Sequence, residues 1–209
     1  MKKIVIHLGL HRTGTTFLQK EVFEKMLDVN YIFDDSLHRF EILNDINLIS
    51  NEGLSLSMPH SYTHRLQVLK HIKKLFPDAK IIIGFREKKS WLKSCYYRYI
   101  LSGGTSTYDD YLEVYAENII DYDKYLFEVK KNFSEVFVYQ FEDLKKNPDK
   151  VISDMCNFIG CKVPNYKIVK RNASLNEKQL NTLRLFNKLP SKLSLLIIPF
   201  IKFIQRTPT

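Results

Sequence analysis

Short apolar runs rich in β-branched residues alternate with longer stretches of helical periodicity along this chain. The apolar runs predict strands over residues 3–8, 29–33, 47–50, 80–85 and 135–140. Apolar positions that recur every three or four residues predict helices over residues 15–27, 62–76, 90–101, 108–131, 148–159 and 176–188. Because strands separated by helices of this length are typical of parallel sheets, the pattern predicts a doubly wound α/β fold with a central, mainly parallel sheet.

A last apolar stripe runs through the C-terminal tail. It covers residues 193–204, but Pro199 and Lys202 interrupt it. No stretch reaches the ~18–20 apolar residues that a membrane-spanning helix needs. We therefore expect one domain over residues 1–188 and an apolar, basic helical tail over residues 189–209. The tail either packs on the domain or a second subunit, or lies in an anionic membrane interface.

Composition and charge narrow the class of protein. With 44% hydrophobic and 26% charged residues, the chain is neither collagen-like nor disordered. Its net charge of +9 favours anionic partners: nucleic acid, phosphorylated or sulfated small molecules, or an acidic membrane surface. Cys95, Cys156 and Cys161 form no C-x-x-C pair and predict neither a disulfide framework nor a zinc ribbon. Only residues 4–6 are continuously apolar near the start, which predicts a cytoplasmic location rather than export.

The loop after the first predicted strand has the pattern of an anion-binding turn. Gly9 and Gly14 lie five residues apart between the strand and a helix, where backbone amides can wrap an oxyanion. Thr15 and Thr16 can add hydroxyl donors. A nucleoside-triphosphatase loop would have lysine at the position of Thr15, whereas the cation here is Arg12. The loop therefore indicates a phosphate-like group held without an obligatory metal, the alternative being a generic glycine-containing turn.

A second cation follows another buried strand. Arg86 comes directly after the strand over residues 80–85, and Ser94 follows eight residues later in the next helix. Because ligands of open α/β sheets bind at the carboxyl ends of the strands, Arg86 and the first loop should face one crevice. A guanidinium and a hydroxyl there can hold a second phosphate. The alternative is an exposed arginine at the end of a strand.

Together these motifs resemble those of the PAPS-dependent sulfotransferases, PAPS being 3′-phosphoadenosine 5′-phosphosulfate. The similar segments are residues 6–18 (5′-phosphosulfate loop), residues 82–86 with Ser94 and Tyr97 (3′-phosphate motif), residues 139–144 with the helix after them, and residues 48–54, which resemble bacterial carbohydrate-type members. The resemblance implies a P-loop-type three-layer domain, PAPS as co-substrate, a hydroxyl-bearing acceptor, and neither a metal nor nucleic acid.

The resemblance also implies site residues. Those expected to bind PAPS are His11, Arg12, Thr13, Gly14, Thr15, Thr16, Arg86, Ser94 and Arg171. Two positions depart from the family pattern. Glu87 follows Arg86 where an asparagine is usual, and a carboxylate there is unfavourable beside a phosphate unless it points away. Arg12 stands where small-molecule members usually have lysine, which favours the carbohydrate-type branch and an acceptor hydroxyl on a carbohydrate or glycoconjugate.

Sulfuryl transfer also needs a base and a stabilising cation. Glu52 is our candidate base, because it follows a predicted strand and matches the glutamate of carbohydrate-type relatives. Arg12 would stabilise the charge that develops on the departing nucleotide. His60 is the second candidate, since a histidine after a strand serves in the small-molecule branch. His60, His64 and His71 also invite a zinc interpretation, but no acidic residue completes an H-E-x-x-H motif.

Tyrosines mark one face of the helix predicted over residues 108–131. They are Tyr108, Tyr111, Tyr115, Tyr122 and Tyr125. This spacing is typical of a face packed on the sheet, and an aromatic wall for an acceptor sugar is the alternative.

Two other classes of function stay open from the residues alone. A P-loop kinase would need a lysine at position 15 and a magnesium-binding carboxylate. A basic nucleic-acid-binding protein would explain the net charge, but not the paired phosphate motifs.

Overall fold

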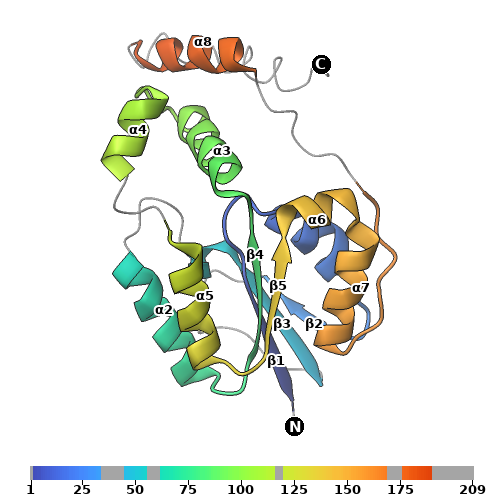
Figure 1. The fold of residues 1–209 in the computed structure, drawn as a ribbon. Helices are drawn as coiled ribbons and strands as arrows, with labels where there is room; N and C mark the ends of the chain where they lie inside the picture. The colour runs from blue at the N-terminus through green and yellow to red at the C-terminus, as the bar shows by residue number, and fades with distance from the viewer. Residues whose placement is uncertain (1, 34–44, 56–61, 116–119, 169–175, 190–209) are drawn as a thin grey trace. The chain divides into compact units, whose positions relative to one another are not determined.

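The computed structural model describes residues 2–33, 45–55, 62–115, 120–168 and 176–189 (Figure 1). Its five strands are β1 (Lys3–Leu8), β2 (Asn30–Ile32), β3 (Ile46–Asn51), β4 (Lys80–Phe85) and β5 (Val136–Gln140). They form one sheet in the order β2-β3-β1-β4-β5, and every neighbouring pair is parallel. All five strands lie where the apolar runs predicted them, and the predicted parallel α/β architecture is confirmed.

The helices are α1 (Thr15–Phe17), α2 (Tyr62–Leu75), α3 (Lys88–Leu101), α4 (Tyr108–Tyr115), α5 (Tyr122–Asn132), α6 (Phe141–Lys146), α7 (Pro148–Ile159) and α8 (Glu177–Asn187). The first is short because the chain continues as a π-helical turn over Leu18–Val22 and a 3₁₀ turn over Phe23–Lys25. Another 3₁₀ turn, Glu52–Ser55, follows β3.

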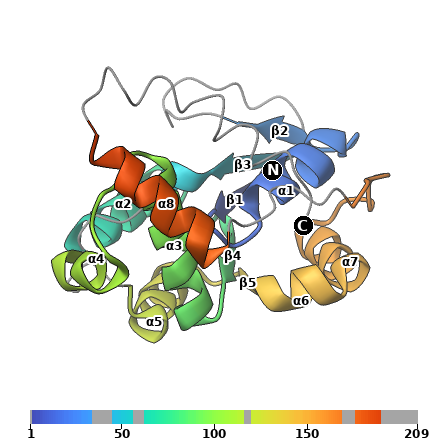
Figure 2. The ribbon, with the colours of Figure 1, turned by 90° about the horizontal axis from the view of Figure 1, so that it is seen from above.

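The chain divides into two compact units, one over Met1–Trp91 and Glu117–Ile168 and the other over Leu92–Ala116 and Val169–Thr209. The first unit contains the whole sheet. Figures 1 and 2 show α2 and α5 on one face of this sheet and α1, α6 and α7 on the other, so the unit has three layers. The domain boundary predicted between residues 188 and 189 stays a prediction, because the tail from residue 190 lies outside the described residues.

Apolar side chains from both faces of the sheet form the core of the first unit. On the α7 face, Val5, Leu48 and Ile82 pack with Ile152 and Met155, all of them fully buried. Each such side chain contributes roughly 1.5–3 kcal/mol by leaving water. This apolar packing fixes the strands and holds their carboxyl ends at one edge.

Local signals set the ends of α7. Asn147 caps the helix by accepting a hydrogen bond from the Lys150 amide (3.3 Å), and Pro148 occupies the first turn. Gly160 ends it with φ +88°, a left-handed conformation that glycine adopts without strain. The helix predicted over residues 148–159 is confirmed.

The single helix predicted over residues 108–131 is wrong. The structure has two helices there, α4 and α5, and Asp121 lies between them in an extended conformation. Its carboxylate accepts a hydrogen bond from the Lys124 amide (3.1 Å) and so begins α5. Because both helices have the same apolar spacing, the periodicity carries on across the break and does not reveal it.

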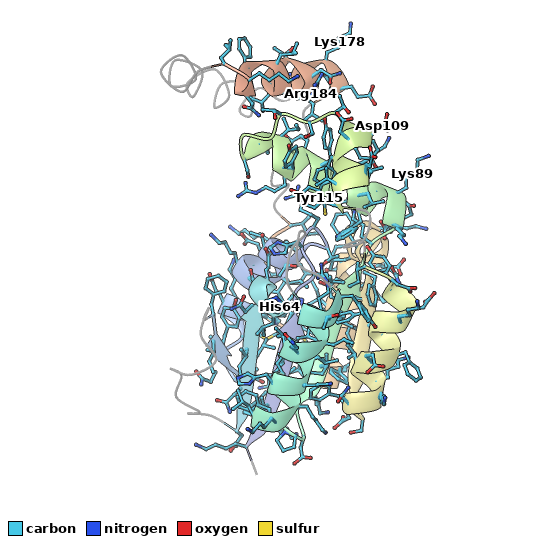
Figure 3. The ribbon with its side chains drawn as sticks, turned by 90° about the vertical axis from the view of Figure 1, so that its left-hand side faces the viewer. His64, Lys89, Asp109, Tyr115, Lys178 and Arg184 are labelled. Atoms are coloured by element: carbon cyan, nitrogen blue, oxygen red, sulfur yellow. The ribbon has the colours of Figure 1, made fainter. Side chains whose placement is uncertain are left out.

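This break divides the tyrosine stripe between the two units. In the second unit, Tyr111 of α4 packs against Tyr96 and Tyr99 of α3, with ring centroids 5.4 and 5.0 Å away, and against Tyr115 (4.9 Å). Figure 3 shows Tyr115 on α4. The α4 part of the stripe therefore packs on other tyrosines of the second unit.

Helix α8 is tied to the remainder of the second unit by hydrogen bonds from Asn187 and from Arg184, whose Nη1 donates to the Thr105 carbonyl (3.5 Å). The Nδ2 group of Asn187 donates to the carbonyl oxygens of Ile100 and Gly104, both at 2.8 Å. A capping box of Asn176 and Gln179 begins the helix. Within the described ranges, no helix has the length and apolar character to cross a membrane.

Candidate functional site

Four chain segments meet at the carboxyl edge of the sheet. β1 lies between β3 and β4, and β5 lies beyond β4. The segments that leave these strands are the β1–α1 loop (residues 9–14), the turn that begins with Glu52, Arg86, and Phe141 at the start of α6. Because all the strands are parallel, these segments lie side by side, with the loop between Glu52 and Arg86.

The β1–α1 loop has an unusual backbone. Arg12 and Gly14 are both left-handed, with φ +71° and +87°. A Cβ on Gly9 would lie 2.6 Å from Cγ2 of Thr15, so the loop closes tightly on the start of α1. A left-handed arginine costs about 1–2 kcal/mol and persists only where its surroundings hold it. Such strain is typical of functional sites.

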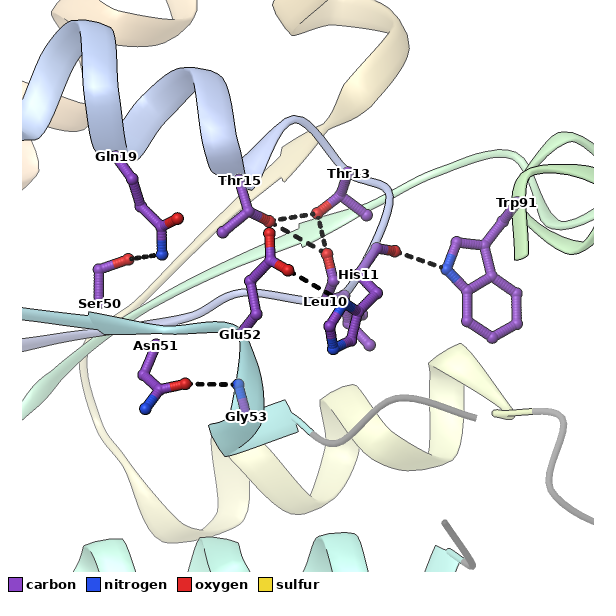
Figure 4. Close-up of polar contacts among 10 residues, drawn as sticks. All are labelled: Leu10, His11, Thr13, Thr15, Gln19, Ser50, Asn51, Glu52, Gly53 and Trp91. Atoms are coloured by element: carbon purple, nitrogen blue, oxygen red, sulfur yellow. Dashed lines mark hydrogen bonds and ion pairs between the residues drawn. The ribbon is translucent and has the colours of Figure 1, made fainter. Parts of the chain in front are cut away.

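Two threonine hydroxyls hold this loop from within (Figure 4). Thr13 donates to the Leu10 carbonyl at 2.6 Å, and Thr15 donates to the same oxygen at 3.2 Å. Both side chains are buried. The hydroxyl of Thr15, expected to contact a bound anion, therefore stabilises the turn in this structure.

Arg86 contacts the loop directly. Its Nη1 donates to the carbonyl oxygen of Arg12 (3.2 Å), and its Nε donates to Oγ of Ser90 (2.8 Å). The guanidinium also lies over the ring of Phe141, 4.6 Å from the centroid. The structure thus brings together the two cationic motifs that the sequence placed 74 positions apart.

The carboxylate of Glu87 caps α3. It accepts hydrogen bonds from the amides of Lys89 (2.9 Å) and Ser90 (2.7 Å), which lower the pKa of Glu87. The negative charge of Glu87 is therefore held by backbone amides at the start of α3. This capping explains how a glutamate can follow Arg86.

The side chains of Glu52 and His11 contact each other at the other side of the loop. Oε2 of Glu52 lies 3.0 Å from Nδ1 of His11, and the two side chains are 29% and 33% exposed (Figure 4). Partial exposure lets a carboxylate at this position meet a bound molecule. The sequence assigned these residues to separate roles, and the structure pairs them.

The remaining expected site residues divide into three groups. Thr16 lies exposed on α1, beside the loop, whereas Ser94 lies on α3 in the second unit. His60 and Arg171 lie outside the described residues. His64 lies exposed on α2 (Figure 3), and the described ranges contain no group of three or more His, Cys, Asp or Glu side chains arranged to hold a metal ion.

Sequence reasoning missed three residues at this edge: Ser90, Trp91 and Phe141. The Trp91 indole donates to the His11 carbonyl at 2.9 Å and so supports the loop (Figure 4). Ser90 could have been found because it stands four residues after Arg86 at the start of a helix. Trp91 has no such signal, and Phe141 was noted only as part of the segment 139–144, because the contacts of both residues join segments that are distant in the chain.

A buried histidine lies beneath the loop. His7 is fully buried in β1, and burial lowers its pKa to about 3, so the ring is neutral at ordinary pH. Its Nδ1 pairs with Oγ of Ser50 (2.8 Å) and its Nε2 with the hydroxyl of Tyr139 (3.3 Å).

This histidine predicts a pH dependence of stability. Below pH 6.5 the unfolded chain binds a proton at His7 that the folded protein excludes, so the free energy of unfolding falls as the pH falls. Between pH 6.5 and 5.5 the loss from this group is about 1 kcal/mol. We expect His7→Gln to remove this part of the slope in urea unfolding at pH 7.5, 6.5 and 5.5. His64→Gln, at an exposed position, should keep it; equal slopes for the two variants would contradict the prediction.

Comparisons with known proteins agree with the fold described above. The chain matches the sulfotransferase domain family model over residues 2–202. A crystal structure of a sulfotransferase from Alicyclobacillus acidocaldarius is similar, with a TM-score of 0.60 and 14% identity, covering 100% of this chain and 97% of that one. The mouse sulfotransferase SULT7A1, crystallised in complex with PAP, has a TM-score of 0.53 and 16% identity, covering 99% and 85% of the two chains. A search of curated proteins finds no match.

At such low identities the two solved structures support the fold, which is of the P-loop type. The family model also supports membership of the family, because it spans nearly the whole chain. The chain therefore belongs to the sulfotransferase domain family and is an enzyme that transfers a sulfuryl group.

Proposed function

We propose that this enzyme takes the sulfuryl group from PAPS and passes it to an acceptor hydroxyl, with Glu52 as general base and without a metal. The observation that carries this proposal is the contact between Arg86 and the carbonyl of Arg12. It joins Arg86 to the loop that carries Arg12 at one edge of the sheet, which supports a donor with two separate phosphate groups.

The β1–α1 loop fits the 5′ end of such a donor. The left-handed Arg12 and Gly14 turn the backbone tightly, and the close approach of Gly9 to Thr15 leaves room for a backbone but not for a side chain. The amides of Thr15 and Thr16 begin a helix and have no preceding helical carbonyl to bind. These amides and the Arg12 guanidinium can hold an oxyanion.

Arg86 fits the 3′-phosphate. Its contacts with Ser90, the loop and Phe141 fix the guanidinium, so little side-chain freedom is lost when an anion binds. Glu87 does not oppose this role, because its carboxylate caps α3. Ser94 and Arg171 stay predicted donor-binding residues.

When bound, PAPS supplies the sulfuryl group, and its bond from sulfur to the bridging phosphate oxygen breaks as the acceptor hydroxyl attacks. Arg12 and the loop amides stabilise the charge on that bridging oxygen. Glu52 takes the proton from the acceptor hydroxyl at its carboxylate, and the contact with Nδ1 of His11 holds this carboxylate in place. His60 stays the second candidate base.

The proposal also covers the acceptor molecule and the cellular location of the enzyme. A carboxylate base in the carbohydrate-type pattern supports an acceptor hydroxyl on a carbohydrate or glycoconjugate. The three cysteines, all free thiols, support a cytoplasmic location. Peripheral membrane contact through residues 189–209 rests on the apolar and basic pattern of that tail alone.

Ligand-dependent melting tests the proposal. Adenosine 3′,5′-bisphosphate, the nucleotide that remains after transfer, should stabilise the protein by about 2.7 kcal/mol at 100 times its dissociation constant, which raises Tm by several degrees. EDTA should change neither this shift nor the turnover. Stabilisation by ATP with magnesium, or by DNA, instead of adenosine 3′,5′-bisphosphate would contradict the proposal and favour a kinase or a nucleic-acid-binding protein.

A further inference from the structure

An asparagine and a glycine flank the candidate base Glu52. Asn51 is the last residue of β3 and is buried, with 6% of its surface exposed. Its Oδ1 accepts a hydrogen bond from the amide of Gly53 at 2.5 Å (Figure 4). Because the 3₁₀ turn Glu52–Ser55 begins directly after Asn51, this amide belongs to the first residues of the turn, which have no carbonyl partner within it. Asn51 therefore caps the turn that carries Glu52.

The same contact explains why position 53 is a glycine. A Cβ on Gly53 would lie 2.9 Å from Oδ1 of Asn51, which is too close for these two atoms. Gly53 does not have a positive φ, so the conformation of its backbone does not require glycine. The close approach of the Asn51 side chain does require it. Asn51 and Gly53 thus act together, because the missing side chain of one makes room for the hydrogen bond of the other.

Buried residues hold both ends of this turn. Asn51 lies in β3, an interior strand between β2 and β1, and Leu54 is buried with 7% exposure. Glu52 lies between these two anchors, and its side chain is 29% exposed. With both ends held and the cap in place, the backbone at Glu52 is fixed. This sets the direction in which the Glu52 side chain leaves the turn.

The side chain of Glu52 lies directly beside the β1–α1 loop. Leu8 and Asn51 are partners in the register of β1 and β3, so Gly9 and Glu52 are the next residues of two neighbouring strands. The position of a Cβ on Gly9 lies 3.4 Å from Cγ of Glu52, which is van der Waals distance. Oε2 of Glu52 then reaches Nδ1 of His11 at 3.0 Å. The capped turn thus directs the carboxylate to the loop.

The cap carries no charge, which suits a neighbouring base. Aspartate caps helical turns as well as asparagine does. An aspartate at position 51, however, would bring a second negative charge next to Glu52, and like charges at close range disfavour the ionised form. Asparagine supplies the acceptor oxygen without that charge. Because a misplacement of about 1 Å can lower a rate ~100-fold, the direction of the carboxylate matters for turnover.

We propose that Asn51 is a positioning residue: by capping the turn at the Gly53 amide, it directs the carboxylate of Glu52 to the β1–α1 loop, where the acceptor hydroxyl reacts. The inference rests on the proposed function in taking Glu52 as the base. Asn51 acts through Glu52 and not through contact with the donor or the acceptor, because its side chain is buried.

The NMR signal of the His11 ring tests this role in the ligand-free protein, because it reports where the carboxylate lies. Two variants of nearly equal size separate the cap from the packing. Asn51→Ala removes the acceptor atom, whereas Asn51→Ser keeps an oxygen that caps well. In Asn51→Ala the His11 signal should shift in the same direction as in Glu52→Gln, since its ring loses the nearby charge in both. Asn51→Ser should resemble the wild type, and His11→Asn identifies the signal.

Asn47→Ala is the matched control. Asn47 is a buried asparagine of the same strand, and its Oδ1 accepts from Nδ2 of Asn30 at 2.9 Å. The substitution removes the same side chain from β3 but leaves the turn capped, so the His11 signal should not move. If Asn51→Ala leaves this signal unchanged, or Asn47→Ala shifts it as much, Asn51 is not a positioning residue.

Hydrolysis of PAPS gives a second readout, with water in place of the acceptor. The water oxygen bonds to sulfur, the bond from sulfur to the bridging phosphate oxygen breaks, and Glu52 takes a proton, so that sulfate and adenosine 3′,5′-bisphosphate form. Asn51→Ala should lower this rate about tenfold, and Asn51→Ser less than about threefold. Calorimetry should show affinity for adenosine 3′,5′-bisphosphate within about twofold of the wild type in both, because a carboxylate that has moved does not change the phosphate contacts.

A double variant separates this inference from the proposed function. In Glu52→Gln protein, Asn51→Ala should lower the rate no further, because both residues act through one carboxylate. A further loss would mean that Asn51 acts by another route, which overturns the inference. If Glu52→Gln keeps the wild-type rate, the proposed base is wrong. In that case, and equally where water does not react, the His11 signal alone decides whether Asn51 directs Glu52.

Discussion

Replacing Glu52 with glutamine should lower turnover at least ~100-fold, the lower range for loss of a general base. Glutamine has nearly the same shape, and its carbonyl oxygen can still accept from Nδ1 of His11, but it cannot take a proton from the acceptor. Steady-state kinetics with a carbohydrate acceptor measures the turnover. Calorimetry should show nearly unchanged affinity for adenosine 3′,5′-bisphosphate, because the other side of the loop binds it.

Two further variants test whether the loss of turnover comes from Glu52 acting as the base. Glu24→Gln removes one carboxylate charge from an exposed position in the same unit and should leave turnover unchanged. His11→Asn removes the imidazole that holds Glu52 and should lower turnover less than Glu52→Gln does. If Glu52→Gln turns over like the wild type, the proton goes elsewhere, and His60 becomes the candidate. If His11→Asn has the larger effect, the imidazole is the base and Glu52 orients it.

Arg12→Ala and Arg86→Ala should each weaken binding of adenosine 3′,5′-bisphosphate at least ~30-fold. Each removes the charged partner of one phosphate, and a hydrogen bond to a charged group contributes about 2 kcal/mol. Isothermal titration calorimetry measures both affinities directly. Because the guanidinium of Arg86 also donates to the Arg12 carbonyl, the double variant should lose less than the sum of the two.

Arg98→Ala is the control for charge alone. Arg98 is an exposed arginine of α3, so its removal lowers the net charge equally without touching the loop. Its affinity for the nucleotide should match that of the wild type at 0.15 M salt, where distant surface charges are screened. Wild-type affinity in both Arg12→Ala and Arg86→Ala would mean that the nucleotide binds elsewhere.

Much of the fold follows from the sequence alone. The apolar runs over residues 3–8 and 80–85 are buried strands because such runs satisfy their backbone only inside a sheet covered on both faces. The same residues predicted that the first loop and Arg86 would lie at one edge, since parallel strands end together. The pattern could not reveal the break at Asp121, because two helices in succession have the same period as one.

The candidate site follows from the sequence only in part. Residue types and spacing predicted the loop and Arg86 as candidates, because backbone amides and cations at the carboxyl ends of strands suit a phosphate-like group. Glu52 was predicted from its place after a strand and from the resemblance to carbohydrate-type relatives. The pairing of Glu52 with His11, by contrast, depends on β1 and β3 being neighbours in the sheet. Local spacing carries no information on which strands are neighbours.

Tertiary structure alone decided how the loop is held. Trp91 supports it from the start of α3, and Tyr139 of β5 reaches His7, in the strand before the loop, from two strands away. In the sequence, Tyr139 is one apolar position of a strand, and Gly84 is an ordinary member of a buried run. Their contact arises only when the sheet forms, because a side chain can cross a neighbouring strand only where that strand has no side chain of its own.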